Sequence, residues 1–345
     1  MSSAGILFVL KAAGLAVFAA ALAVVLAAEV YAALIGTAGR TPVPDWLGNH
    51  ASNLDRLREG AGGDAAFTFA VVGDTKSYGT FARLCEPLRR EPPAFMLVLG
   101  DMVSRGTPAH HAFLHRQAAG TWGVTCPVLC VPGNHDTSAD EFPLARWEEM
   151  YGPSLFAFEY RQNLFIGLRL IERQSTAESL AFLEATLKAK RARNRRAFVF
   201  LHCPPALTGR SENDGFTGDQ AFMALCAAHK VDHVFAGDYH GYLRATTGTT
   251  VYQTIGTGGM HLRDRYLTAH MLLLVTVEPD RVCEQLVSTP PVVRVGEVAA
   301  EAALADVWPW LRAHWIAAVL MNVVLAAGLG MVSRTLFRLF WPSAA

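Results

Sequence analysis

The segment Val-Pro-Gly-Asn-His-Asp at residues 131–136 brings three kinds of chemically active side chain together. Asn134, His135 and Asp136 can supply a metal ligand, a general acid and a group that orients the acid. They follow an apolar run, Pro127 to Val131, which is typical of a buried strand. Asn, Asp and Gly are also common turn residues, so this segment alone fits a polar turn equally well.

Four other predicted strands also end in polar residues. These ends are Gly73-Asp74-Thr75-Lys76 after Phe67–Val72, Gly100-Asp101 after Phe95–Leu99, His202 after Phe198–Leu201, and Gly237-Asp238-Tyr239-His240 after His233–Ala236. In an open α/β sheet, strand ends at one edge converge on the crevice where ligands bind. Together the clusters offer oxygen and nitrogen donors suited to Zn, Mn or Fe. The sequence therefore predicts a metal site.

The elements that must position these residues lie between residues 66 and 289. Further β-rich runs are Val128–Val131, Leu164–Leu170, Thr250–Ile255, Met271–Val277 and Val282–Val287. The segment Ala177–Ala192 has apolar residues at helical spacing, which indicates an amphipathic helix. Strands that alternate with helices, followed by a mostly β part, predict an α/β domain.

Both ends of the chain are strongly apolar. Residues 12–28 carry no charge, and the apolar run resumes after Glu29 as far as Ile35. About 20 apolar residues span a bilayer, so we expect a transmembrane anchor within residues 1–36. The alternative is a signal peptide cleaved near Ala33, but this apolar region is longer than the roughly 7–15 residues of a usual signal core.

A second uncharged segment covers residues 315–333. Trp308, Trp310 and Trp315 lie before or at its start and Trp341 follows it, as expected for side chains that anchor at membrane interfaces. The length, the lack of charge and the flanking tryptophans favour a transmembrane helix over a buried helix of a soluble domain.

The few basic residues beside the two spans predict the topology. Lys11 precedes the first span, and Arg334 and Arg338 follow the second, with Arg312 before it. Basic residues favour the cytoplasmic side. We therefore expect a protein of the bacterial inner membrane, with both termini in the cytoplasm and the central domain outside.

Composition completes the predicted domain division. The segments between spans and domain are rich in Gly and Pro or in Ala and Glu, and they resemble linkers. The expected parts are an N-terminal anchor (1–36), a linker (37–65), a catalytic domain (66–289), a second linker (290–311), and a C-terminal transmembrane helix with a short tail (312–345).

With 30 basic and 30 acidic residues, no basic excess indicates a nucleic-acid partner. No CxxC pair occurs, and Cys126 and Cys130 would lie roughly 13 Å apart on one strand, too far for a disulfide.

The order of the polar motifs resembles that of the calcineurin-like metallophosphoesterases. Their pattern is D-x-H, G-D-x-x-x-x-G, G-N-H-D/E, a lone His and G-H-x-H. The segments GDMVSRG at residue 100 and GNHD at residue 133, and the strand before His202, match well. The resemblance covers roughly residues 66 to 288 and implies a β-sandwich flanked by helices.

The resemblance also implies a two-metal site and a reaction. Asp101 would bridge two divalent ions, with Asp74 and His240 on the first and Asn134 and His202 on the second. A bridging hydroxide would attack phosphorus in line. His135 would assist the leaving group, with Asp136 orienting its ring.

Two positions depart from the family pattern. Asp238 stands where a His belongs, and we expect it to bind the second metal as a carboxylate. Lys76 stands where the first motif has its His, and an ammonium cannot ligate a cation. Lys76 would swing out of the site, or replace the ion's charge and bind substrate phosphate in a one-metal enzyme, or a neighbour such as Tyr78 would complete the shell. We expect a weak first metal, and hence two ions (Mn, Fe or Zn) or one tightly bound ion.

Other polar groups give weaker signals. His111 and His115 share a helical face with His110 nearby, and without an acidic partner we interpret them as a solvated face. Arg105 lies inside the second motif and is a candidate for gripping substrate phosphate. The glycine-rich turn at residues 256–259, with His261 close behind, fits a plain β-turn or a phosphate-binding turn. Strand alternation points Cys203 away from the site.

These observations predict a membrane-anchored, metal-dependent phosphoesterase. Its substrate would be a phosphomonoester or phosphodiester, and location near the bilayer suggests a lipid-linked phosphate. The alternative is a catalytically weakened module that binds phosphate or nucleotide at the membrane. Retention of His135 with Asp136 favours catalysis. A transporter is disfavoured because neither span carries a cluster of polar groups.

Overall fold

The computed structural model describes residues 3–37, 41–60, 62–63, 65–171, 177–207, 215–263 and 267–340. The chain forms two compact units. One consists of residues 41–297, and the other of residues 1–40 together with 298–345. The first unit holds every strand of the described part and every predicted site residue, so the chemistry is positioned by this unit.

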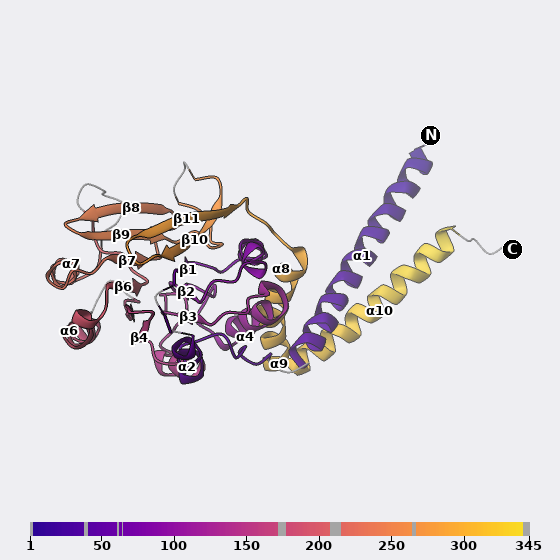
Figure 1. Cartoon of the computed structure of the whole chain (residues 1–345). Helices are drawn as coiled ribbons and strands as arrows, with labels where there is room; N and C mark the ends of the chain where they lie inside the picture. Colours follow the sequence, from indigo (N-terminus) through magenta and orange to yellow (C-terminus); the bar gives the residue numbers. More distant parts are fainter. Residues whose placement is uncertain are drawn as a thin grey trace. The chain divides into compact units, whose positions relative to one another are not determined.

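The larger unit contains two β-sheets (Figure 1). Their strand orders are β11-β10-β1-β2-β3 and β4-β5-β6-β7-β9-β8. The strands are β1 (Phe67–Val72), β2 (Met96–Val98), β3 (Val128–Cys130), β4 (Phe156–Tyr160), β5 (Asn163–Gly167), β6 (Arg196–Leu201), β7 (His233–Ala236), β8 (Tyr242–Thr247), β9 (Thr250–Ile255), β10 (His270–Val277) and β11 (Val282–Thr289). Strands β1 to β3 are parallel, as are β5, β6, β7 and β9. Their carboxyl ends therefore share an edge within each sheet.

Strand β1 shows why the strands read as continuous apolar runs. Phe69 and Val71 belong to the core between the sheets, where the Phe69 ring lies 5.4 Å from that of Phe165 in β5. Ala70 and Val72 belong to the core on the other face of the first sheet. Because both faces are buried, alternation of apolar and polar residues is lost.

Helices pack around both sheets. They are α2 (Ala51–Glu59), α3 (Thr80–Leu84), α4 (Pro108–Gln117), α5 (Leu144–Tyr151), α6 (Ala177–Lys190) and α7 (Asp219–Ala228), with short helical turns η1 (Pro87–Arg89), η2 (Ala118–Trp122) and η3 (Arg191–Arg193). Helices α3, α4 and α5 contribute to the core outside the first sheet, and α6 and α7 to the core outside the second. This arrangement confirms the predicted α/β sandwich flanked by helices.

Two strands lie outside the predicted set. In β4, Phe156 and Phe158 face the core and alternate with half-buried residues, and the strand pairs antiparallel with β5. The edge strand β8 pairs with β9 and has no fully buried residue. Its polar composition explains why the sequence pattern did not predict it, because an edge strand needs few apolar side chains.

The other unit is helical. It contains α1 (Ser3–Thr37), η4 (Ala303–Val307), α9 (Trp308–Ala313) and α10 (Trp315–Phe340), and α8 (Val295–Ala302) precedes η4. By length and composition, Phe8–Thr37 and Trp315–Thr335 could each cross a membrane. Gly36 lies against the Trp308 ring, where any side chain would collide. Trp341 lies outside the described residues, and the finer division into anchors and linkers stays a prediction.

Candidate metal centre

Three aspartates at strand ends adopt a left-handed backbone conformation. The φ angles are 57° at Asp74, 55° at Asp101 and 62° at Asp238, after β1, β2 and β7 respectively. Asp is one of the few residues besides Gly that visits this region, and it does so at a conformational cost. Such strained residues gather at functional sites, and here all three belong to the predicted ligand set.

Gly100 allows two of the turns to meet. Its φ angle is 84°, and a Cβ there would lie 2.6 Å from the Gly133 nitrogen and 2.8 Å from His202 Nδ1. Only glycine satisfies both the backbone angle and the space. The turns after β2 and β3 therefore pack directly against each other beside His202.

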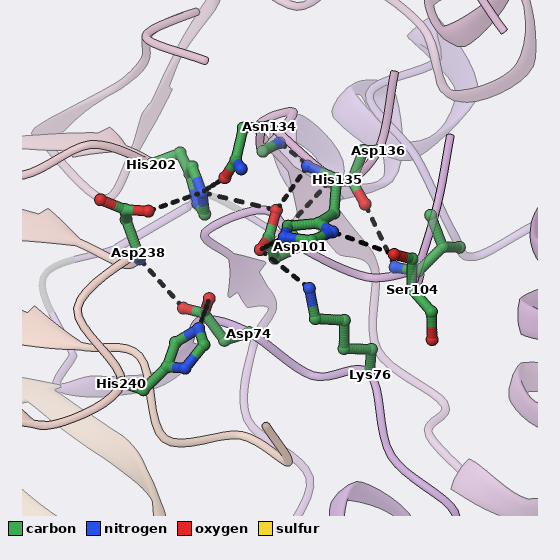
Figure 2. Close-up of polar contacts among 12 residues, drawn as sticks. Asp74, Lys76, Asp101, Ser104, Asn134, His135, Asp136, His202, Asp238 and His240 are labelled. Carbon is green, nitrogen blue, oxygen red and sulfur yellow. Dashed lines mark hydrogen bonds and ion pairs between the residues drawn. The ribbon is translucent and has the colours of Figure 1, made fainter. Parts of the chain in front are cut away.

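One group of possible metal-ligand atoms surrounds Nε2 of His202 (Figure 2). This nitrogen lies 2.9 Å from Asn134 Oδ1, 3.5 Å from Asp101 Oδ1 and 3.8 Å from Asp238 Oδ1. Nδ1 of the same ring lies 2.7 Å from the carbonyl oxygen of Leu99. Because a carbonyl oxygen only accepts hydrogen bonds, Nδ1 donates this one, and Nε2 is the nitrogen that faces the possible metal-ligand oxygens. A partner of this kind fixes the orientation of a metal-binding His.

Asp74, Asp101 and His240 form a second, adjoining group. One ligand atom from each lies within 4.8 Å of the others, and all three residues are buried. His240 Nε2 is 3.2 Å from Asp74 Oδ1, and Asp74 Oδ2 accepts a hydrogen bond of 3.0 Å from the Asp238 backbone. Among the described residues, the buried atoms Asp74 Oδ1 and His240 Nδ1 have no hydrogen-bond partner. This group could hold a metal ion.

Lys76 points into the centre. Its Nζ lies 3.1 Å from Asp101 Oδ2, and its side chain is only 5% exposed. The alternative in which Lys76 swings out of the site is therefore wrong. Asp101 has one oxygen, Oδ2, beside an ammonium and the other, Oδ1, beside His202.

His135 lies at the open side of the centre. Its side chain is 43% exposed, and Nε2 lies 3.9 Å from Asp101 Oδ2. Nδ1 lies 2.9 Å from the carbonyl oxygen of Ser104, so Nδ1 donates this hydrogen bond and Nε2 remains on the side of the cluster.

Asp136 makes contacts other than the one we expected. We predicted that it orients His135, but the Ser104 carbonyl holds that position. Both carboxylate oxygens of Asp136 instead accept backbone N–H groups at 2.7–3.2 Å, from Asp101, Met102, Val103 and Gly133. The residue ties the turn after β3 to the turn after β2.

With this geometry in place, comparison with known proteins identifies the family. The sequence matches the family model for calcineurin-like phosphoesterases over residues 67–242, half of the chain. The chain belongs to the calcineurin-like phosphoesterase family. The match starts at β1 and ends in β8, and it includes all five polar clusters.

Solved structures show the same fold. A purple acid phosphatase from yellow lupin (Lupinus luteus) seeds is 13% identical with a TM-score of 0.51, over 66% of this chain and 52% of that chain. A dimetal phosphatase from Danio rerio is 14% identical with a TM-score of 0.51, over 66% of this chain and 97% of that chain. No curated protein matches the sequence.

The residues of this centre fit a divalent cation. Asp74, Asp101 and Asp238 place three carboxylates at the centre, and Lys76 is the one lysine paired with them among the described residues. This leaves an excess of negative charge among largely buried groups, which is costly unless a cation compensates it. Asp74 Oδ1, which accepts no hydrogen bond from the described residues, is one atom that such a cation would bind.

The charged groups of the cluster shift one another's pKa values. Burial alone would raise the pKa of Asp101, but His202 and Lys76 outweigh it, so the pKa lies below its ordinary value. Burial alone would lower the pKa of His202, but Asp101, Asp74 and Asp238 outweigh it and raise that pKa to about 9. A metal ion must displace this proton to bind Nε2, so metal binding and proton release are linked.

The histidines of α4 correct another prediction. We interpreted His110, His111 and His115 as a solvated face, but all three are buried. Nδ1 of His111 and Nε2 of His115 lie 2.7 Å and 2.9 Å from the Tyr151 hydroxyl, and Nε2 of His111 lies 2.9 Å from the Asp136 carbonyl. Their partner is thus a tyrosine of α5, distant in sequence, and this network supports the turn that carries His135.

The remaining candidates are a packed glycine turn, a buried cysteine and two exposed residues, His261 and Arg105. The glycine turn packs on the first polar cluster, where Gly258 donates a backbone hydrogen bond of 2.9 Å to Gly73. His261, just beyond it, has its ring 4.9 Å from that of His240, a neighbour that no motif indicated. Cys203 is buried in the core outside the second sheet, with its Sγ 3.5 Å from the Ile171 carbonyl oxygen. Arg105 is exposed, and its role stays a prediction.

Proposed function

We infer that this protein hydrolyses phosphate esters with the help of divalent metal ions. The observation that carries the inference is the convergence of Asp74, Asp101, Asn134, His202, Asp238 and His240 at strand ends in a chain of the calcineurin-like phosphoesterase family. These six residues form the centre within which metal would be held. When bound, divalent ions acidify a water molecule and neutralise phosphate charge.

The protein's own residues account for the remaining steps. The His135 side chain is 43% exposed, whereas His202 and His240 are buried, so His135 is the imidazole available to a substrate. With Nδ1 donating to the Ser104 carbonyl, the doubly protonated ring of His135 would give its Nε2 proton to the leaving-group oxygen. Lys76 and Arg105 would bind the phosphate oxygens, and Asp136 would keep the His135 turn in place.

The two long apolar helices support a membrane location. We assign the protein to a bacterial inner membrane, with both termini in the cytoplasm and the catalytic domain outside, on the basis of the basic residues that flank the spans. A site held near a bilayer would meet lipid-linked phosphate esters at high local concentration.

The test is a substrate comparison on the full chain purified in detergent. We expect turnover of a chromogenic phosphodiester or phosphomonoester with Mn²⁺, and turnover of phospholipid or isoprenoid phosphates if the lipid-linked assignment is correct. Chelator-treated protein should be inactive. If no ester is turned over with Mn²⁺, Zn²⁺ or Fe²⁺, hydrolysis is not the function.

One observation favours a second candidate, a phosphate-binding module without turnover. The Lys76 ammonium occupies one side of Asp101 and would bind phosphate in the absence of a second ion. Saturable binding of inorganic phosphate by protein that fails every turnover assay would support this candidate, and Mn²⁺-dependent turnover would exclude it.

A further inference from the structure

The two departures from the family pattern lie on different sides of Asp101. Lys76 contacts Oδ2 of Asp101 at 3.1 Å. Asp238 lies on the side of Oδ1, where its own Oδ1 is 3.8 Å from His202 Nε2, and that nitrogen is 3.5 Å from Asp101 Oδ1. Figure 2 shows the two residues reaching the centre from separate turns. One departure adds a positive charge, and the other adds a negative charge.

Lys76 is a fixed part of the centre. Its side chain is 5% exposed and ends on a carboxylate that is 2% exposed. A buried ammonium with this partner cannot leave without stranding a charge in the interior. An ammonium has no lone pair, so it cannot ligate a cation. Its positive charge also repels any cation that approaches the same oxygen.

The His202 side offers four possible ligand atoms, one more than the Asp74, Asp101 and His240 group, and Lys76 lies on the other oxygen of Asp101. Asn134 Oδ1, Asp101 Oδ1 and Asp238 Oδ1 approach His202 Nε2 within 2.9–3.8 Å. The set contains two carboxylates, an amide oxygen and an imidazole, and divalent Mn, Fe and Zn accept such ligands.

We propose that this protein binds a single divalent cation, on the His202 side of Asp101, and that the Lys76 ammonium takes the place of a second ion. The inference rests on the proposed function only in taking the cluster to be a metal centre. Lys76 then acts as a permanent cation that faces substrate phosphate without depending on metal supply.

The experiment counts bound Mn²⁺ by equilibrium dialysis and elemental analysis of the full chain in detergent. We expect one tightly bound ion per unmodified chain and two in Lys76→His, with the electron paramagnetic resonance spectrum changing from isolated to coupled Mn²⁺. Lys188→Ala, which removes an exposed lysine on α6, is the matched control and should keep one ion.

A pair of histidine variants locates the ion. His202→Asn should weaken Mn²⁺ binding at least about tenfold, because an imidazole whose other nitrogen is held by a carbonyl group, as that of His202 is by Leu99, is a strong metal ligand. His240→Asn should leave the affinity within about threefold. The reverse pattern would overturn the proposed position of the ion.

The stoichiometry separates failure of this inference from failure of the proposed function. Two tightly bound ions in the unmodified protein, or one ion in a folded Lys76→His, would overturn the single-ion inference while leaving metal-dependent hydrolysis intact. No bound Mn²⁺ would overturn both. If Lys76→His fails to fold, as judged by thermal unfolding, the count in unmodified protein still decides.

Discussion

Asp136 and His135 are adjacent in sequence, but their side chains contact different groups. Both oxygens of Asp136 accept backbone N–H groups, two for each oxygen, from the turns after β2 and β3. Burial and the charge of Asp101 raise the pKa of Asp136 to about 7, and the backbone donors Gly133 and Met102, together with the charge of His202, oppose that rise. The side chain therefore stabilises the turns that carry Asp101 and His135.

Replacing Asp136 by Asn should destabilise the fold. An amide NH₂ group would face two backbone N–H donors, which would lose their acceptor in a buried site. A buried unsatisfied donor costs about 1–3 kcal/mol, so we expect a loss of about 2–5 kcal/mol in the free energy of unfolding. Thermal unfolding of the full chain in detergent measures it. If stability is unchanged and only turnover falls, Asp136 instead acts through His135.

His135→Gln should separate catalysis from metal binding. The variant keeps a polar side chain of similar reach but cannot transfer a proton, so turnover of a poorly activated ester should fall about 10²-fold or more. The side chain is half-exposed and lies 3.9 Å from Asp101 Oδ2, beyond hydrogen-bond distance, so Mn²⁺ affinity should be retained. An unchanged turnover rate would show that the leaving group departs without His135.

At the residue scale, sequence spacing predicted which side chains converge but not how each is held. Strand ends located Asp74, Asp101, Asn134, His202, Asp238 and His240, because apolar runs and the polar residues after them are local signals. The partners that set the ring orientations are the carbonyl groups of Leu99 and Ser104. Every residue carries a carbonyl, so its choice as a partner leaves no trace in the sequence.

At the scale of elements, α4 and α5 are joined by buried polar side chains. The Tyr151 hydroxyl lies between His111 and His115, and the Phe142 ring stacks on His111 at 3.8 Å between centroids. Burial lowers the pKa of His115 to about 4 and that of His111 to about 3. Both rings are therefore neutral in the folded protein at neutral pH.

This pair should make the fold sensitive to acid. The folded pKa of His115 lies below its unfolded value of 6.5, so between about pH 4 and pH 6.5 the unfolded chain binds more protons. The stabilisation is complete above the unfolded pKa and is lost as the pH falls toward the folded pKa. At about pH 5 the loss for His115 is about 2 kcal/mol.

His115→Gln isolates this effect. The variant should unfold more easily at neutral pH, but it should lose about 2 kcal/mol less between about pH 7.5 and pH 5 than the unmodified protein. Thermal unfolding at the two pH values gives the comparison. Parallel pH profiles would show that His115 does not contribute to acid sensitivity.

The elements also show where sequence patterns are insufficient. Buried strands such as β1 and β7 were predicted with their bounds, because both faces are apolar. Strand β8 was not, because it lies at a sheet edge with polar, exposed side chains. The histidines of α4 were misinterpreted because their partner, Tyr151, is 36 to 40 residues away in sequence.

At the scale of the whole molecule, one cysteine provides a test of topology. Cys283 is exposed, whereas the other five cysteines are buried. With the catalytic domain outside the cytoplasm, a membrane-impermeant maleimide should label intact cells at Cys283, and Cys283→Ser should abolish labelling. Labelling only after the cells are broken would place the domain in the cytoplasm and reverse the proposed orientation.

The central claim is that a metal held around Asp101 drives phosphoester hydrolysis. The most direct measurement is turnover of a chromogenic phosphodiester by the full chain, stripped with chelator and then titrated with Mn²⁺, in parallel with Asp101→Asn. We predict no turnover without metal, recovery that saturates with Mn²⁺ in the unmodified protein, and a loss of about 10³-fold or more in folded Asp101→Asn. Equal turnover by the metal-free protein, or by Asp101→Asn, would contradict the claim.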